Sequence, residues 1–160
     1  MTREFSSELL VPLGIDKVFP FFSDPFNLEE LTPPWLRFKI LTTAPIDMRA
    51  GAVIDYRLSI RGLPVRWSSE ITAWEPPHRF VDEQIRGPYR YWSHEHRFEP
   101  TDGGTLICDR VRYLAPGWIL EPVLHRVFVR PDVERVFRYR IAQLEERFGV
   151  VKRSGPAGQA

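Results

Sequence analysis

The sequence predicts an α+β fold in which an antiparallel sheet is covered by one long C-terminal helix. Strand-like runs joined by short turn signals fill residues 36–114. The chain then changes to helical spacing, and apolar residues recur three or four positions apart, at Val133, Phe137, Ile141, Leu144 and Phe148. This helix is the largest element that could bury the apolar face of the sheet, so we expect it to lie across that face.

The N-terminal region is expected to form one strand and then two short helices. Glu4–Val11 alternates loosely between polar and apolar residues and ends before a proline, which favours a strand. Residues 15–22 place apolar side chains on one helical face, and Pro25–Leu31 predicts a second short helix. Ser23 or Asp24 is the candidate N-cap of this second helix, because a proline at the first helical position follows.

The middle of the chain predicts the rest of the sheet. Its strand-like runs are Leu36–Thr43, Ala52–Ile60, Val65–Trp74, Arg79–Arg86, Tyr89–Glu99 and Thr105–Leu114. The last five are joined by short turns, of which Asp102-Gly103-Gly104 is the strongest hairpin signal. With the N-terminal strand, these runs give an antiparallel sheet of about seven strands.

The C-terminal segment is expected to be helical from Trp118 to Phe148. Pro131 interrupts it, which predicts a kink or two helical segments at that point. Gly149 is a candidate C-cap. We therefore expect a single domain over residues 1–149, followed by a polar tail over residues 150–160 that is too rich in glycine and proline to be ordered.

Composition excludes several classes of function. The 160 residues are 43% hydrophobic and 27% charged, with a formal net charge of +1, so nothing favours binding to nucleic acid or to an anionic membrane surface. A single cysteine, Cys108, cannot form an internal disulfide or a cysteine-based zinc motif. The N-terminus lacks the apolar core of a secretory signal, and no run approaches the ~20 apolar residues of a membrane span. We expect a cytoplasmic protein with no integral membrane association, either a monomer or a homodimer.

The most informative stretch is the strand that contains two of the four histidines. Side chains alternate between the two faces of a strand, so Trp92, His94, His96 and Phe98 share one face. That face is apolar at both ends and polar in the middle. Because a buried imidazole needs hydrogen-bond partners, this pattern suits the wall of a ligand cavity better than a dry core.

The same alternation, with charged residues directed to solvent, predicts the inner face of the whole sheet. Charged Arg66, Glu70, Arg110 and Arg112 are assigned to the outer face, which also carries Cys108. The expected ligand-binding wall consists of Trp67, Ser69, Ile71, Gln84, Trp92, His94, His96, Ile107, Asp109 and Tyr113, with Tyr56 as a further candidate. The side of the last helix that bears Arg138, Tyr139 and Arg140 is expected to face solvent.

Several short motifs, in register along the chain, together resemble one known superfamily. They are Trp35-Leu36-Arg37-Phe38, Trp67-Ser68-Ser69-Glu70-Ile71, Phe80-Val81-Asp82-Glu83-Gln84, Gly87-Pro88, Trp92 to Phe98, Gly103-Gly104-Thr105-Leu106, Asp109 to Tyr113 and Phe137-Arg138-Tyr139-Arg140. Their order is similar to that of the START-like, birch-pollen-allergen superfamily (SRPBCC), in its bacterial polyketide cyclase/dehydrase-like branch. The resemblance implies a helix-grip fold, in which a curved antiparallel sheet wraps around the C-terminal helix and leaves a cavity between them.

The leading hypothesis is non-catalytic binding of a small, largely hydrophobic molecule, such as a lipid, polyketide or quinone. Two alternatives stay open. The first is a cyclase- or dehydrase-type enzyme with a His–Asp acid–base pair, for which His94, His96 and Asp109 are the candidate catalytic residues. The second is an interaction module with a closed core. His94 and His96 with Asp82 or Asp109 could also form a two-histidine, one-carboxylate metal site, but alternating histidines are a weak signal. We expect no metal and no cofactor, and we favour binding over enzymatic activity, which stays open.

Overall fold

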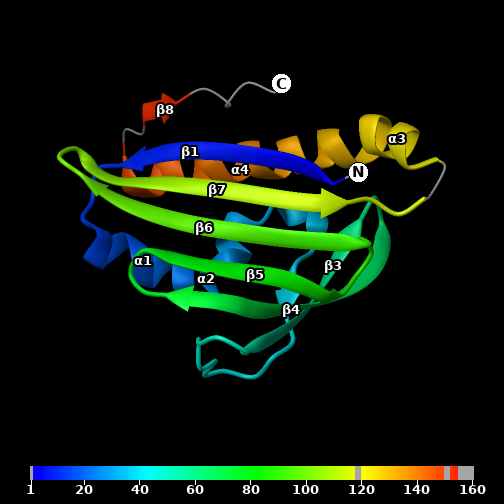
Figure 1. The fold of residues 1–160 in the computed structure, drawn as a ribbon, viewed down its shortest axis with the longest axis horizontal. Helices are drawn as coiled ribbons and strands as arrows, with labels where there is room; N and C mark the ends of the chain where they lie inside the picture. The colour runs from blue at the N-terminus through cyan, green and yellow to red at the C-terminus, as the bar shows by residue number, and fades with distance from the viewer. Residues whose placement is uncertain (1, 118–119, 150–151, 155–160) are drawn as a thin grey trace.

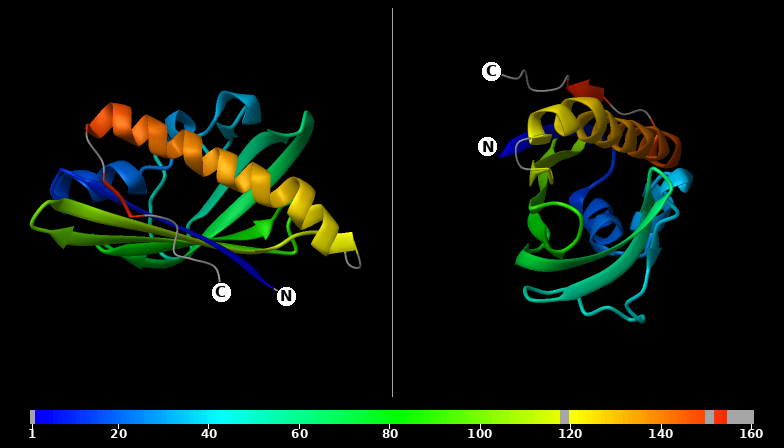
Figure 2. Two further views of the ribbon diagram at one scale, coloured as in Figure 1. Left: turned by 90° about the horizontal axis from the view of Figure 1, so that it is seen from above. Right: turned by 90° about the vertical axis from the view of Figure 1, so that its right-hand side faces the viewer.

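The fold is one antiparallel sheet that curves around a long helix, as Figure 1 and Figure 2 show. The computed structural model describes residues 2–117, 120–149 and 152–154. Within these residues the sheet has eight strands in the order β2-β3-β4-β5-β6-β7-β1-β8. The strands are β1 (Arg3–Val11), β2 (Lys39–Ile40), β3 (Val53–Ile60), β4 (Leu63–Glu75), β5 (Arg79–Arg86), β6 (Tyr91–Thr101), β7 (Gly104–Leu114) and β8 (Lys152–Ser154).

The helices lie on the concave side of this sheet (Figure 2). They are α1 (Ile15–Ser23), α2 (Asn27–Leu31), a 3₁₀ turn (Pro34–Leu36), α3 (Glu121–Leu124), a π-helical turn (His125–Val129) and α4 (Arg130–Phe148). Asp24 accepts a hydrogen bond from the backbone N–H of Phe26 at 2.9 Å, which holds the turn into α2. The predicted α+β helix-grip architecture, with two short helices after the first strand, is confirmed.

One predicted strand is much shorter than its apolar pattern suggested. Leu36–Thr43 was expected to be extended, but only Lys39–Ile40 pairs, as edge strand β2 on β3. The prolines at positions 33 and 34 start a 3₁₀ turn instead, and that turn ends at Arg37 in the left-handed region, with φ 45°. The chain becomes extended only after this turn, because the turn geometry overrides local strand propensity.

Pro131 was predicted to kink or divide the C-terminal helix, yet it does not break the helical stretch, which runs without a gap from Glu121 to Phe148. It lies in the first turn of α4, directly after the π-helical turn. Proline has no N–H to donate to the carbonyl of the preceding turn, and a wide π turn accommodates that missing hydrogen bond. Gly149 ends α4 with φ 87° and donates its N–H to the carbonyl of Glu145 at 3.0 Å, which confirms the C-cap. Trp118, where the helix was expected to begin, lies outside the described residues.

The chain after Gly149 was expected to be a disordered tail. Lys152–Ser154 instead forms β8, which pairs antiparallel with β1 from Glu8 to Leu10. The edge of β1 that faces away from β7 has backbone groups free for such pairing. The rest of the tail, residues 150–151 and 155–160, lies outside the described residues. No helix of the described ranges is long and apolar enough to cross a membrane.

The core fills one end of the space between the sheet and α4. Val18, Phe19 and Phe22 of α1 pack with fully buried Phe98 of β6 and with Leu144 of α4. This cluster lies where α1 meets β6 and β7. The other end of the concave face, toward β3, β4 and β5, is not filled in this way, and the cavity lies there.

Candidate ligand cavity and its histidine–aspartate cluster

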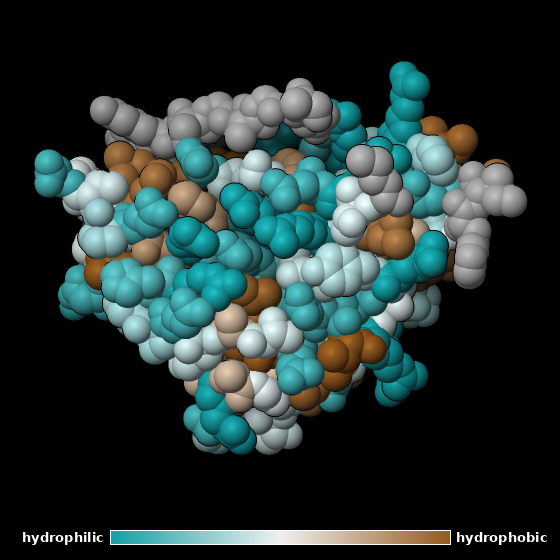
Figure 3. All heavy atoms as spheres, in the orientation of Figure 1, coloured by the Kyte–Doolittle hydropathy of each residue, from teal (hydrophilic) through white to brown (hydrophobic). Residues whose placement is uncertain are grey.

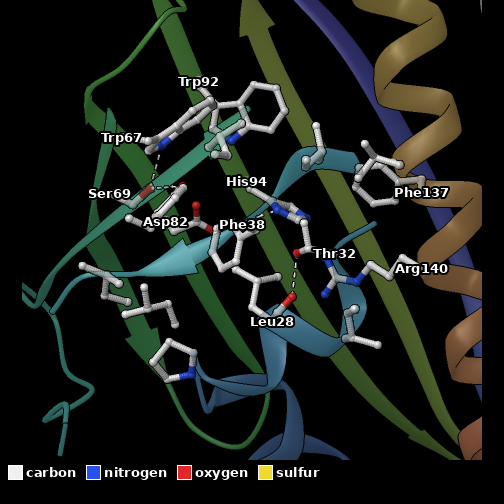
Figure 4. Close-up of a pocket in the computed structure, with 18 of the residues that line it drawn as sticks. Leu28, Thr32, Phe38, Trp67, Ser69, Asp82, Trp92, His94, Phe137 and Arg140 are labelled. Atoms are coloured by element: carbon white, nitrogen blue, oxygen red, sulfur yellow. Dashed lines mark hydrogen bonds and ion pairs between the residues drawn. The ribbon is translucent and has the colours of Figure 1, made fainter. Parts of the chain in front are cut away.

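A cavity of about 520 Å³ lies between the concave face of the sheet and α4. Its walls come from β3, β4, β5 and β6 on one side and from α2, the 3₁₀ turn and α4 on the other (Figure 4). The lining is mainly apolar and aromatic, and the volume falls within the range usual for small-molecule sites. Seven residues of the ligand-binding wall predicted from the sequence do line this cavity: Tyr56, Trp67, Ser69, Ile71, Trp92, His94 and His96.

Four of the expected wall residues, Gln84, Ile107, Asp109 and Tyr113, do not line the cavity. Ile107 is buried in the core beside Phe98, because the first helix and α4 cover this part of β7. The Gln84 side chain instead binds the backbone of Tyr89, donating to its carbonyl at 2.7 Å and accepting from its N–H at 3.3 Å.

Tyr113 is directed toward the C-terminal helical region instead of the cavity. Its hydroxyl lies 3.0 Å from Nε2 of His125, in the π-helical turn, and its ring is buried beside Phe137. The alternation of side chains along the strands predicted the inner face of the sheet correctly. It could not predict which part of that inner face the helices cover.

Two histidines and two aspartates form a buried cluster at the cavity wall, here called the His–Asp cluster: Asp82, His94, His96 and Asp109. Nε2 of His94 lies 3.0 Å from Oδ1 of Asp109, and Nδ1 of His96 lies 2.9 Å from the same oxygen. On the other side, Nε2 of His96 is hydrogen-bonded to Oδ2 of Asp82 at 3.2 Å, while Nδ1 of His94 is 3.9 Å from it. The cross-strand register produces this arrangement, because His94 pairs with Asp82 and His96 pairs with Asp109.

Both carboxylates of the cluster are ionised. Burial by itself would raise the pKa of Asp109, but the charge of Arg140 and the contacts with both histidines outweigh it and hold that pKa well below its usual value. Burial opposes ionisation of Asp82 as well, yet its hydrogen bond with His96 lowers its pKa overall. Each carboxylate can therefore only accept hydrogen bonds.

The pKa values of the two histidines shift in opposite directions. Burial and the neighbouring His96 lower the pKa of His94, which keeps it neutral. Its Nε2 carries the proton and donates to Asp109, so Nδ1 keeps a lone pair, 3.9 Å from Oδ2 of Asp82. Burial also disfavours the charged form of His96, but contacts with Asp109 and Asp82 raise its pKa above the usual value. Nδ1 of His96 is not aligned for a hydrogen bond, so its attraction to Asp109 is electrostatic.

A second polar group lies on β3 and β4. The indole N–H of Trp67 donates to Oγ of Ser69 at 3.1 Å, and that hydroxyl is also 3.1 Å from the hydroxyl of Tyr56. Burial raises the pKa of Tyr56 well above its usual value, so it remains a neutral hydrogen-bonding group. The cavity therefore presents polar contacts at two places on an otherwise apolar wall.

Asp82, His94 and His96 could together hold a metal ion. One carboxylate oxygen and two ring nitrogens from them lie within 4.8 Å of one another. However, the hydrogen bond between His96 and Asp82 occupies the position that a cation would need, and the guanidinium of Arg140 adds positive charge nearby. The proton between Nε2 of His96 and Oδ2 of Asp82 joins these two atoms without a metal.

The sequence analysis missed the roles of two residues of this site. Asp82 was placed on the same face of its strand as Gln84 but was named only as a possible metal ligand. Arg140 was expected to face solvent, and the structure shows this to be wrong: it is buried and lines the cavity. A signal was present, because Arg140 lies three residues after Phe137 and four before Leu144, on the apolar stripe of the helix.

Comparison with known proteins identifies the family. The family described as polyketide cyclase / dehydrase and lipid transport matches residues 11–138. The chain belongs to this family. A search of curated proteins found no match.

Several solved structures share the fold of this chain at low sequence identity. The ZhuI aromatase/cyclase from Streptomyces sp. R1128 is 18% identical, with a TM-score of 0.72, over 92% of this chain and 93% of that one. Protein TTHA0849 from Thermus thermophilus is also 18% identical, with a TM-score of 0.72, over 91% and 97%. Major latex-like protein 151 from Panax ginseng is 13% identical, with a TM-score of 0.65, over 92% and 98%. At these identities the likeness establishes the fold alone.

Proposed function

We propose that this protein binds a small, largely apolar molecule in the cavity between the sheet and α4, and holds its polar end at the His–Asp cluster. The observation that carries the proposal is a cavity of about 520 Å³ whose mainly apolar wall contains a few convergent polar groups. The volume also argues against the closed-core interaction module, which requires side chains to fill this space.

The lining supports an elongated or aromatic ligand. Trp67 and Trp92 meet edge to face, with ring centroids 5.3 Å apart, at one end of the cavity. Leu28 and Leu31 of α2 contribute aliphatic surface on the opposite side. Burial of a ligand against such surfaces is worth about 25 cal/mol for each Å² removed from water.

Binding can be tested first with a neutral apolar probe, N-phenyl-1-naphthylamine, whose fluorescence rises in an apolar site. Val136 of α4 lines the cavity, so Val136→Trp should fill part of it and weaken probe binding. Val123 in α3 is 60% exposed and lies outside the cavity, so Val123→Trp is the matched control and should bind like the wild type. Native mass spectrometry of protein from its own host, followed by extraction, would then identify a resident ligand. No probe binding to the wild type, or equal binding by Val136→Trp, would contradict the proposal.

A second candidate is acid–base catalysis in the same cavity, which the cluster geometry specifically favours. The unprotonated Nδ1 of His94 could remove a proton from a carbon next to a carbonyl group, leaving the electron pair on the carbonyl oxygen. The resulting imidazolium would be stabilised by Asp109, which already holds the opposite nitrogen at 3.0 Å. This arrangement of base and orienting carboxylate is a common one for proton transfer.

Exchange of the α-protons of 2-tetralone in D₂O, followed by NMR, tests this candidate without a known substrate. Catalysis by His94 requires faster exchange with the wild type and a return to the uncatalysed rate with His94→Gln. An unchanged exchange rate at saturating wild-type protein, with the ketone shown to be bound, would leave non-catalytic binding as the function.

A further inference from the structure

Arg140 is the only positively charged side chain of α4 that the structure buries among the described residues. It is 7% exposed and extends from the helix into the cavity, toward Thr32 and His94 (Figure 4). Its Nε has no hydrogen-bond partner among the described residues. A guanidinium has five N–H donors, and leaving buried donors without acceptors is costly, so this side chain requires explanation.

The neighbours of Arg140 stabilise its charge but do not satisfy its donors. Its guanidinium carbon lies 5.6 Å from the ring centroid of Phe22 and 6.0 Å from that of Phe137, which gives weak cation–π contacts. Its charge also lowers the pKa of Asp109 and of Asp82 through space. Both carboxylates nevertheless direct their hydrogen bonds to the two histidines of the cluster.

We propose that Arg140 binds a carboxylate group of the cavity's ligand, so that the ligand class is a small apolar carboxylic acid. A carboxylate supplies the planar pair of acceptors that matches two parallel N–H donors of a guanidinium. The apolar remainder of the molecule would lie against the aromatic and aliphatic wall. This inference rests on the proposed binding function and adds to it the chemistry of the ligand's polar end.

The position of Arg140 supports a buried anchor more than a surface contact. Other arginines of α4 reach partners at the protein surface: Arg130 pairs with Glu134 at 2.8 Å, and Arg135 lies over the Trp35 ring at 4.1 Å. Arg140 differs in that it lines the cavity as a buried side chain and makes no ion pair at the surface with any described residue. An acid would enter this site as its anion, and the guanidinium would provide the charge that compensates for the loss of water.

The test compares acids with neutral analogues of the same shape, as competitors of N-phenyl-1-naphthylamine. Two pairs cover aromatic and aliphatic ligands: 2-naphthoic acid with 2-naphthamide, and dodecanoic acid with dodecanol. Since hydrogen bonds to charged groups are among the strong ones, we expect the acid of at least one pair to bind wild-type protein about 10- to 100-fold more tightly than its neutral partner. That preference should disappear in Arg140→Gln and remain in Arg138→Gln, a control on the exposed side of the same helix.

The outcomes separate this inference from the proposed function. If the neutral probe and neutral analogues bind but no acid is preferred, the carboxylate inference is wrong and apolar binding stands. A preference that survives in folded Arg140→Gln overturns the role of Arg140. Failure of the wild type to bind any of these compounds overturns both proposals. The wild-type comparison of acid with neutral analogue decides the ligand class even if the Arg140 variant does not fold.

Discussion

Asp109→Asn should strongly destabilise the protein and change how its stability depends on pH. Asp109 is only 6% exposed, accepts a hydrogen bond from His94 at 3.0 Å and lies 2.9 Å from Nδ1 of His96. Asparagine keeps the size of the side chain but removes the negative charge that attracts both ring nitrogens. Removing one partner of a buried ionic network costs about 3–5 kcal/mol, which is a large part of a typical free energy of unfolding.

The pH dependence follows from the lowered pKa of Asp109. The folded value lies well below the ordinary 3.8, so the carboxylate contributes its full stabilisation above that value and loses it as the pH falls through the folded value. The variant has no such group. The difference in free energy of unfolding between wild type and variant should therefore be largest near neutral pH and shrink in acid.

Urea unfolding followed by tryptophan fluorescence, at about pH 7 and about pH 3, measures both the loss of stability and its dependence on pH. Asp102→Asn, in the exposed β6–β7 turn, is the control and should shift stability by no more than about 0.5 kcal/mol. The reasoning fails if Asp109→Asn costs less than about 1 kcal/mol at neutral pH, or if its cost is the same in acid.

Three further predictions concern packing, the cavity rim and metal binding. Phe98→Ala, at a fully buried core position, should lower the free energy of unfolding by about 3–5 kcal/mol, and a smaller loss would mean that the core collapses around the gap. Arg61 of the β3–β4 turn makes two 3.0 Å contacts with Asp132 of α4, so Arg61→Ala should cost less than about 1 kcal/mol because the pair is half-exposed. The same variant should release the neutral probe faster in stopped-flow measurements, whereas an unchanged rate would show that this contact does not restrict exit. Excess Zn²⁺ or EDTA should leave the melting temperature unchanged, and a Zn²⁺-dependent rise that Asp82→Asn abolishes would establish a metal site at the His–Asp cluster.

The outer face of the sheet is mostly hydrophilic in Figure 3, and apolar residues there form separate small groups. This agrees with the assignment of charged residues such as Arg110 and Arg112 to solvent. The thiol of Cys108 is half-buried, and burial raises its pKa to about 11, so it is a poor nucleophile near neutral pH.

Local pattern was sufficient for most of the fold. Period-two alternation and turn residues located six of the strands closely, because those signals depend on neighbours in the chain. The same alternation placed His94 and His96 together on the inner face. It failed for Leu36–Thr43, where a proline-initiated 3₁₀ turn replaced the start of an otherwise strand-like run.

The sequence by itself determined the architecture, the inward face of the sheet and the presence of paired histidines on it. Only the tertiary structure decided which inward residues meet a cavity and which meet the core, because this depends on where α1 and α4 cover the sheet. It also decided the opposite pKa shifts of the two histidines, since cross-strand register brings Asp82 and Asp109 to opposite sides of the two rings. Arg140 shows the same limit most clearly. This arginine lies only two residues after the exposed Arg138, yet it is buried and lines the cavity because its position on the helix faces the sheet.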